Sequence, residues 1–313
     1  MMGTVLEITV DAEDTAAART AIEACFARAL ELEAIFTTWN EESELARLNG
    51  DAGGKEREIS SDLARILGDA LELAAQTEGA FDPTVGPLVT LWRDARLSGR
   101  LPERPEIDSA QAAVGYGGIE LDGEKARLAR RGMAVDLGGF AKGWTLDRLG
   151  ELLAERGIHR ALLDFGQSSM YGLGRPSDAP AWRVLVRDPR GGYAGVVSLR
   201  DQSLSVSESF GESALVAGRR LGHVIDPRSA RPLDRQTGAV VVAPSGAAAE
   251  AWSKALLVLA PEHALGMLEK AEGTEAMLLE PKGIRATPGF VAAVDFVVGE
   301  GARNVTAPDV PAP

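Results

Sequence analysis

The segment from Val135 to Asp147, VDLGGFAKGWTLD, places an Asp, a Gly pair and a Lys-Gly pair where a strand is expected to pass into a helix. Gly138 and Gly139 have no Cβ, so the backbone there can come close to a ligand. A helix that opens just after them directs free N–H groups and the positive end of its dipole at the turn. Phosphate groups are the usual ligands of such a turn, whereas many other Gly-rich turns bind nothing, so the segment indicates a phosphate site only in combination with other motifs.

Composition excludes several classes of protein. The chain has 313 residues, is 45% hydrophobic and carries a net charge of −13, which suits a globular protein with a large core. The acidic balance argues against a nucleic-acid partner, because phosphate backbones bind Lys and Arg. Cys25 is the only cysteine, which rules out an intrachain disulfide. We find no membrane-spanning segment and no leader, so the sequence as written predicts a cytoplasmic location; the alternative is an exported protein whose leader has been removed.

The spacing of apolar residues predicts an α+β fold. Helices are expected at 14–36, 63–76, 141–156 and 247–259, and strands at 5–10, 126–136, 161–165, 182–187, 195–199, 239–243, 275–279 and 289–298. The segment 96–108 is rich in Pro and charge and predicts a surface loop, and 301–313 predicts a flexible tail. Strands and helices alternate without a regular βαβ repeat, so we expect mostly antiparallel sheets with flanking helices.

Four other segments accompany the Val135–Asp147 segment in a distinctive order. They are TWNEESELARLN (38–49), GAFDPTVGPL (79–88), SLSVS (203–207) and HVIDPRSARP (223–232). Together, and over the stretch from Met2-Gly3-Thr4 to about Leu259, they make the chain resemble the ApbE family, the FAD:protein FMN transferases.

The resemblance implies an activity and an architecture. Family members cleave FAD, pass its FMN half to a Thr or Ser of a partner protein and release AMP, and they use a divalent metal, usually magnesium. The resemblance therefore implies a single ApbE-like domain over 1–300, with two lobes around a central flavin cleft. It also implies an acceptor protein that carries a Thr or Ser flavinylation site.

Carried over motif by motif, the resemblance also implies site residues. The FAD site would be lined by Met2, Trp39, Ala80, Phe81, Asp82, Asp136, Lys142 and Ile225. His223 would act as general base to the acceptor hydroxyl, a role that suits an imidazole titrating near neutral pH. Ser205 and Ser207 would help to shape the acceptor channel, and Gly139 and Glu250 would bind the metal.

Each of these residues also has a structural interpretation. Trp39 could stack on a flavin ring or lie half-buried near a turn. Asp82 and Asp136 could accept hydrogen bonds from the flavin nucleotide or simply cap their turns. His223 could be a hydrogen-bonded scaffold residue. Lys142 could be a solvated lysine, but its charge opposes the dipole at a helix start, and that misfit supports a nearby phosphate.

The segment 249–255, AEAWSKA, departs from the family's metal site, Ala-Asp-Ala-x-x-Thr-Ala. Glu250 replaces the metal-binding Asp, and Lys254 replaces the metal-binding Thr. Magnesium takes oxygen ligands, whereas an ammonium group has three donors and no acceptor. Magnesium is therefore in question, and we hypothesise that Lys254 neutralises the FAD diphosphate in its place. Gln167 and Ala230 stand where relatives have Gly, and both are expected to narrow the site.

The sequence thus predicts an FAD:protein FMN transferase. One alternative is an ApbE-like protein that binds FAD but has weak or no transferase activity, because its metal site is altered. Another is an FAD pyrophosphatase, in which water takes the place of the acceptor.

Overall fold

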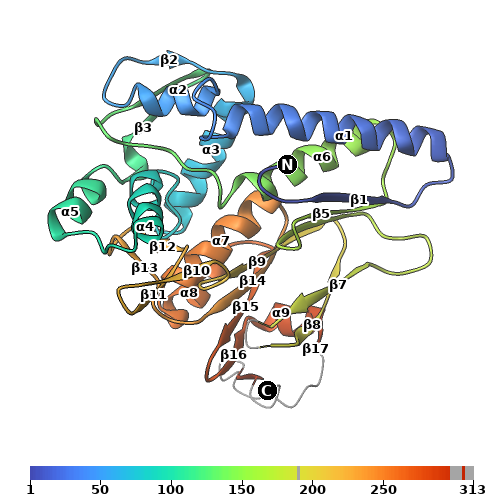
Figure 1. The fold of residues 1–313 in the computed structure, drawn as a ribbon. Helices are drawn as coiled ribbons and strands as arrows, with labels where there is room; N and C mark the ends of the chain where they lie inside the picture. The colour runs from blue at the N-terminus through green and yellow to red at the C-terminus, as the bar shows by residue number, and fades with distance from the viewer. Residues whose placement is uncertain (189–190, 297–304, 307–313) are drawn as a thin grey trace.

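The structure, a computed structural model, describes residues 1–188, 191–296 and 305–306. Its centre is an eight-stranded sheet in the order β1-β5-β6-β9-β14-β15-β16-β18 (Figure 1). The strands are β1 (Leu6–Val10), β5 (Ala161–Phe165), β6 (Ser169–Leu173), β9 (Gln202–Glu208), β14 (Gly238–Ala243), β15 (Glu275–Glu280), β16 (Gly283–Ala286) and β18 (Val305–Thr306). All neighbours pair antiparallel except β16 and β18, which confirms the predicted α+β class with mostly antiparallel sheets.

Smaller sheets surround the central one. One contains β17 (Val294–Phe296), β8 (Tyr193–Leu199) and β7 (Trp182–Arg187), and another contains β2 (Arg57–Glu58), β4 (Lys125–Leu128) and β3 (Ile119–Asp122). Two hairpins pair β10 (Ser213–Val216) with β11 (Arg219–Gly222) and β12 (Ile225–Asp226) with β13 (Arg231–Pro232). The strands predicted at 182–187 and 195–199 are confirmed as β7 and β8, which pair antiparallel.

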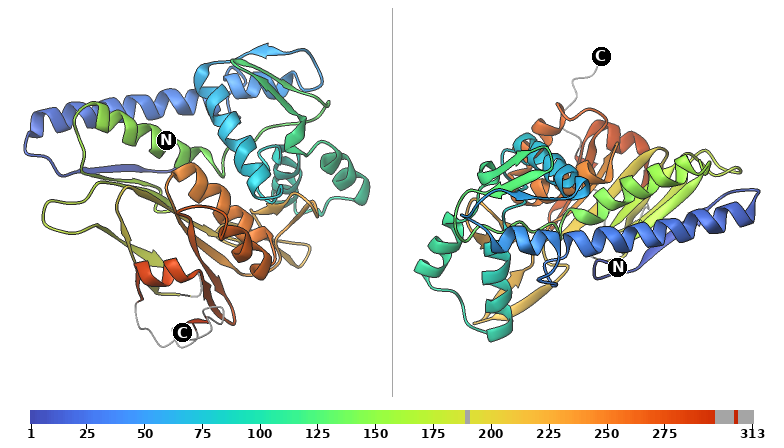
Figure 2. Two further views of the ribbon diagram at one scale, coloured as in Figure 1. Left: turned by 180° about the vertical axis from the view of Figure 1, so that it is seen from behind. Right: turned by 90° about the horizontal axis from the view of Figure 1, so that it is seen from above.

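Helices flank the sheets. They are α1 (Thr15–Phe36), α2 (Glu44–Gly50), α3 (Ser61–Gln76), α4 (Gly86–Ser98), α5 (Arg104–Ala112), α6 (Ala141–Glu155), α7 (Gly246–Val258), α8 (Pro261–Leu268) and α9 (Pro288–Ala293), with a 3₁₀ turn, η1, at Tyr116–Gly118. The long helix α1 runs beside α6 (Figure 2). Helix α7 packs on β9, on β14 and on α6, so it joins the central sheet to the helical layer.

Two glycines let α6 and α7 approach closely. A Cβ on Gly143 of α6 would lie 2.3 Å from the Gly246 carbonyl oxygen, and a Cβ on Gly246 would lie 2.2 Å from the Gly143 carbonyl oxygen. Asp147 of α6 accepts the N–H groups of Gly246 and Ala247 at 2.6 and 3.0 Å, which caps the first turn of α7. The starts of the two helices are therefore locked together.

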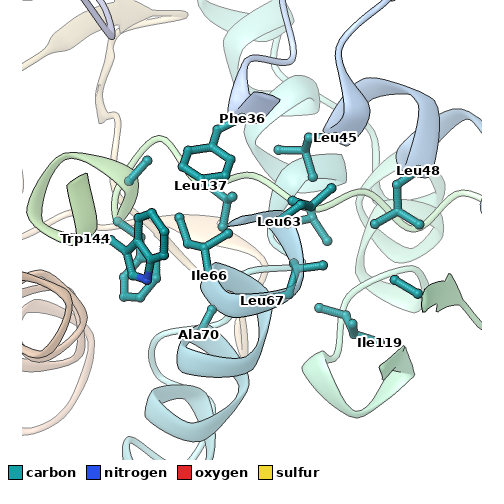
Figure 3. Packing of buried hydrophobic residues seen from close by; sticks show 14 of the residues in the cluster. Phe36, Leu45, Leu48, Leu63, Ile66, Leu67, Ala70, Ile119, Leu137 and Trp144 are labelled. Atoms are coloured by element: carbon teal, nitrogen blue, oxygen red, sulfur yellow. The ribbon is translucent and has the colours of Figure 1, made fainter. Parts of the chain in front are cut away.

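A hydrophobic cluster fixes the segment that precedes α6 (Figure 3). Leu137 and Phe140 are buried in this cluster, while Gly138 and Gly139 between them are exposed. Trp144 packs edge-to-face against Phe36 with ring centroids 5.5 Å apart. The apolar residues on either side thus anchor the Gly pair and turn it outward.

Several predicted elements are wrong. The segment 96–108 is mostly helical, because α4 continues to Ser98 and α5 begins at Arg104. Pro105 sits in the first turn of α5, where its missing N–H costs nothing, and Glu103 and Glu106 form a capping box. The predicted strand 289–298 is helix α9 followed by the short strand β17, and 297–298 lie outside the described residues.

The strand predicted at 126–136 ends at Leu128. The backbone N–H and C=O of Val135 bond to the Asn49 side chain at 2.8 and 2.9 Å, and the Asp136 N–H donates to the Pro83 carbonyl at 2.8 Å. An extended segment bound in this way leads into α6 instead of a regular strand. Of the predicted tail, Val305–Thr306 form β18 and the remainder lies outside the described residues.

Candidate functional site

A cleft of about 1710 Å³ lies between the helical layer and the sheets. Its walls come from the chain start, the end of α1, the segments 80–89 and 134–142, β7, β9, the segment 223–227 and α7. All site residues predicted from the sequence line it except Ser205 and Glu250: Met2, Trp39, Ala80, Phe81, Asp82, Asp136, Gly139, Lys142, Ser207, His223, Ile225 and Lys254. The structure therefore brings together residues more than 250 positions apart in the chain.

The Gly138–Gly139 turn forms one wall of the cleft. Asp136 accepts the N–H of Gly138 at 2.7 Å, which closes the turn. Asn49 holds the preceding residue, Val135, through two hydrogen bonds between its side-chain amide and the backbone. No role was predicted for Asn49 from the sequence, although Asn side chains often bond to backbone groups.

Lys142 lies in the first turn of α6, beside this wall. Its ammonium donates to the Ser168 hydroxyl at 2.6 Å. Burial lowers the pKa of Lys142, and the charges of Asp164 and Glu212 partly oppose that shift. A half-buried cation bound to a neutral hydroxyl is incompletely compensated, so this position favours an anionic ligand.

Glu250 is completely buried and does not reach the cleft surface. One carboxylate oxygen accepts from the Ser169 hydroxyl, and the other contacts the ammonium of Lys254. Burial lowers the pKa of Lys254 well below its usual value, with a smaller effect from Lys142. The Glu250 carboxylate in direct contact acts in the opposite direction and stabilises the charged form.

The predicted metal ligands do not fit a divalent cation. The Lys254 ammonium contacts Glu250, and the stem of its side chain lies beside the Gly139 turn, where a Cβ on Gly139 would lie 3.4 Å from Lys254 Cε. A metal placed there would meet a positive charge instead of an oxygen ligand. Within 1–188 and 191–296, no group of three or more His, Cys, Asp or Glu residues could hold a metal ion.

The two serines of the 203–207 segment brace α7 against β9. Ser205 and Ser207 bond to the Ser253 hydroxyl at 3.0 and 2.9 Å. Ser207 lines the cleft and Ser205 is buried behind it, so a role in the acceptor channel stays a prediction. Gln167 also lines the cleft, whereas Ala230 is fully buried outside its lining, so the expectation that Ala230 narrows the site is wrong.

Asp82 acts as a structural cap. Its carboxylate accepts the N–H and hydroxyl of Thr84 at 2.8 and 2.6 Å and the N–H of Tyr116 at 3.0 Å. These bonds hold the 82–85 turn against the start of η1. The turn interpretation is therefore confirmed for Asp82. A ligand could bond to Asp82 only through a carboxylate lone pair that these three hydrogen bonds leave unused.

His223 is exposed to the cleft, and its Nδ1 lies 3.3 Å from both the N–H and the carbonyl oxygen of Glu212. The tautomer with a proton on Nδ1 donates to that carbonyl and leaves Nε2 free to accept a proton. Partial burial by the surrounding walls lowers the pKa of His223, opposed by Glu212 and supported by the charges of Lys254 and Arg96.

The rim of the cleft carries an exposed aromatic ring. Trp39 is 82% exposed, and the Arg93 guanidinium lies 5.2 Å from its ring centroid. The half-buried interpretation of Trp39 is therefore wrong.

At the chain start, the Met2 N–H donates to Glu33 at 2.5 Å and holds that end beside the cleft. Among the described residues, no helix combines the length and apolar character needed to cross a bilayer.

Comparisons with known proteins agree with this geometry. The model of the ApbE family matches residues 2–278. The FAD:protein FMN transferase of Treponema pallidum is 30% identical over 314 residues, covering 94% of this chain and 87% of that protein. The enzyme of the same name from Escherichia coli is 29% identical over 259 residues, covering 80% and 73%. The crystal structure of the ApbE protein of Thermotoga maritima superposes with a TM-score of 0.84 at 25% identity, covering 93% and 96%.

Proposed function

Since the chain belongs to the ApbE family, we propose that it is an FAD:protein FMN transferase, which moves FMN from FAD to a Thr or Ser of an acceptor protein. The observation that carries this proposal is the convergence of the family motifs on one cleft of about 1710 Å³. Typical small-molecule sites measure roughly 300–1,000 Å³, so the cleft has room for a dinucleotide and an entering acceptor segment.

The chemistry divides among the groups that line the cleft. The bond between the FMN phosphorus and the bridging oxygen of the FAD diphosphate breaks, and an ester bond forms between the acceptor oxygen and the FMN phosphorus. AMP leaves with the bridging oxygen. The Gly138–Gly139 turn, Lys142 and Lys254 bind the diphosphate, and Trp39 offers a face on which an aromatic ring can stack.

His223 takes the proton from the acceptor hydroxyl. Only its neutral form with Nδ1–H bonded to Glu212 can do so, because Nε2 must be unprotonated. The base is lost as pH falls through the folded pKa of His223, which lies below the usual value of 6.5.

We therefore expect a specific pH profile. The transfer rate should rise with pH through a value below 6.5 and be level around neutral pH. His223→Gln, which cannot take a proton, should lose this acidic limb and slow transfer by about 10²–10⁴-fold. Rates measured from about pH 5 to pH 8 with saturating FAD check this. An unchanged acidic limb in the variant would show that another group is the base.

A fluorescence assay tests the proposed activity. The protein is incubated with FAD and a flavin-acceptor domain of an ApbE substrate, and the acceptor is separated by denaturing electrophoresis. Covalent flavin fluorescence on the acceptor with equimolar AMP is the expected result, and substitution of the acceptor Thr or Ser by Ala should abolish it. AMP release without fluorescence would identify a pyrophosphatase, and bound FAD with neither product would identify a binding protein.

A further inference from the structure

Lys254 is held in the cleft wall by a buried polar network. Its ammonium contacts the carboxylate of Glu250, which lies one helical turn earlier in α7 and is completely buried. Ser169 of β6 donates to the other oxygen of that carboxylate, and Ser253 lies 3.4 Å from the Lys254 ammonium. The residues of this network lie in helix α7 and strand β6, which hold the Lys254 ammonium in a fixed position.

Lys142 places a second ammonium in the same cleft. It comes from the first turn of α6, which the Gly143–Gly246 contact locks against α7. The side chains of both lysines line the cleft together with the exposed Gly138–Gly139 turn. Lys142 bonds to a neutral hydroxyl, and Lys254 shares its charge with one carboxylate. Within the described part of the chain, the pair thus presents more positive charge than its direct contacts neutralise.

A diphosphate is the ligand chemistry that this arrangement suits. Its two phosphate groups carry negative charge along a short axis, and two ammonium groups beside the exposed Gly138–Gly139 turn can each engage one of them. A divalent cation does not suit the same place, because the Lys254 ammonium already occupies the contact with Glu250. The cation that the site needs is therefore part of the polypeptide.

We propose that Lys254, held by Glu250, is the built-in cation of the FAD diphosphate site, and that this chain binds FAD without a divalent metal. The inference rests on the proposed function for the identity of the nucleotide. During transfer, the anhydride electrons move to the departing AMP phosphate, and the Lys254 ammonium neutralises charge on the diphosphate without itself gaining or losing a proton.

FAD binding tests the inference directly and does not depend on transfer. Quenching of flavin fluorescence gives the Kd of the full chain for FAD in EDTA and in excess Mg²⁺. The two values are expected to agree within about twofold, because neither lysine needs the metal. FAD binding that appears only with Mg²⁺ would overturn the inference and leave the proposed function intact. No FAD binding under either condition would overturn both.

A double variant tests Lys254 itself. Lys254→Met alone would strand the buried Glu250 charge, so it is combined with Glu250→Gln, which can still accept from Ser169. Loss of one charged hydrogen bond should weaken FAD binding in EDTA by about 10–100-fold and leave riboflavin, which has no phosphate, unaffected. Lys270→Met, which removes an exposed ammonium outside the cleft, is the matched control and should bind FAD as the native chain does.

The outcomes separate cleanly. A thermal melt shows whether the double variant folds, and the comparison of EDTA with Mg²⁺ on the native chain decides the metal question even if it does not. Equal weakening for riboflavin and FAD would show that Lys254 only shapes the cleft. FAD binding equal to that of the native chain would show that Lys254 does not contact the diphosphate. Either result would overturn its role as the cation.

Discussion

A Gly143→Ala substitution should separate α6 from α7 and lower stability by about 3 kcal/mol. The added Cβ would lie 2.3 Å from the Gly246 carbonyl oxygen and 2.6 Å from Glu250 Cγ, and the backbone atom cannot move aside without shifting the helix. For a chain of this size, the melting temperature should fall by roughly 5–10 °C. Thermal unfolding followed by circular dichroism measures it.

Gly266→Ala is the matched control for this prediction. Gly266 lies in helix α8, is exposed, and a Cβ there would meet nothing within 4 Å. Alanine is a better helix former, so this variant should be up to about 1 kcal/mol more stable than the native chain. Equal melting temperatures for Gly143→Ala and the native chain would show that the contact between α6 and α7 is not as close as described.

Lys142→Met should weaken FAD binding by about 10–100-fold, because it removes a charged hydrogen-bond donor to the diphosphate and keeps the apolar stem. The same variant should be at least as stable as the native chain at neutral pH. Because the pKa of Lys142 is lowered in the folded state, its charged form is less favourable in the folded chain than in the unfolded chain at neutral pH. Methionine carries no charge and so removes this free-energy cost of folding. Fluorescence titration and thermal unfolding measure the two effects separately.

If Lys142→Met weakens FAD binding and does not lower the stability of the fold, Lys142 serves function and not folding. Riboflavin is the control ligand, because it lacks phosphate and its affinity should not change in Lys142→Met. A variant that binds FAD normally would show that the 136–142 turn is only a structural junction. A variant that melts well below the native chain would show that Lys142 stabilises the fold.

The sequence predicted which residues line the cleft better than it predicted the contacts that each of them makes. The motifs around Trp39, Asp82, Asp136 and His223 lie in separate segments, and all four residues line the cleft. Their individual roles depend on contacts from distant segments that no spacing reveals. Asp82, for example, bonds to the Tyr116 backbone, 34 residues away.

The errors in secondary structure have physical causes. Pro and charged residues at 96–108 indicate a loop by composition, yet Pro105 and the Glu103–Glu106 pair are signals for a helix start. The apolar run before Asp136 has the composition of a strand, but Asn49 takes the hydrogen bonds that a neighbouring strand would have supplied. The local spacing of apolar residues therefore located the apolar segments correctly, but it did not reveal which groups bond to their backbone.

A crystal structure of this protein grown with FAD in the presence of EDTA would show whether the two lysines bind the diphosphate without a divalent metal. We expect the diphosphate to lie against the Gly138–Gly139 turn, with the ammonium groups of Lys142 and Lys254 in hydrogen-bonding contact with it. A cleft without nucleotide at saturating FAD, or a diphosphate bound away from both lysines, would contradict this expectation.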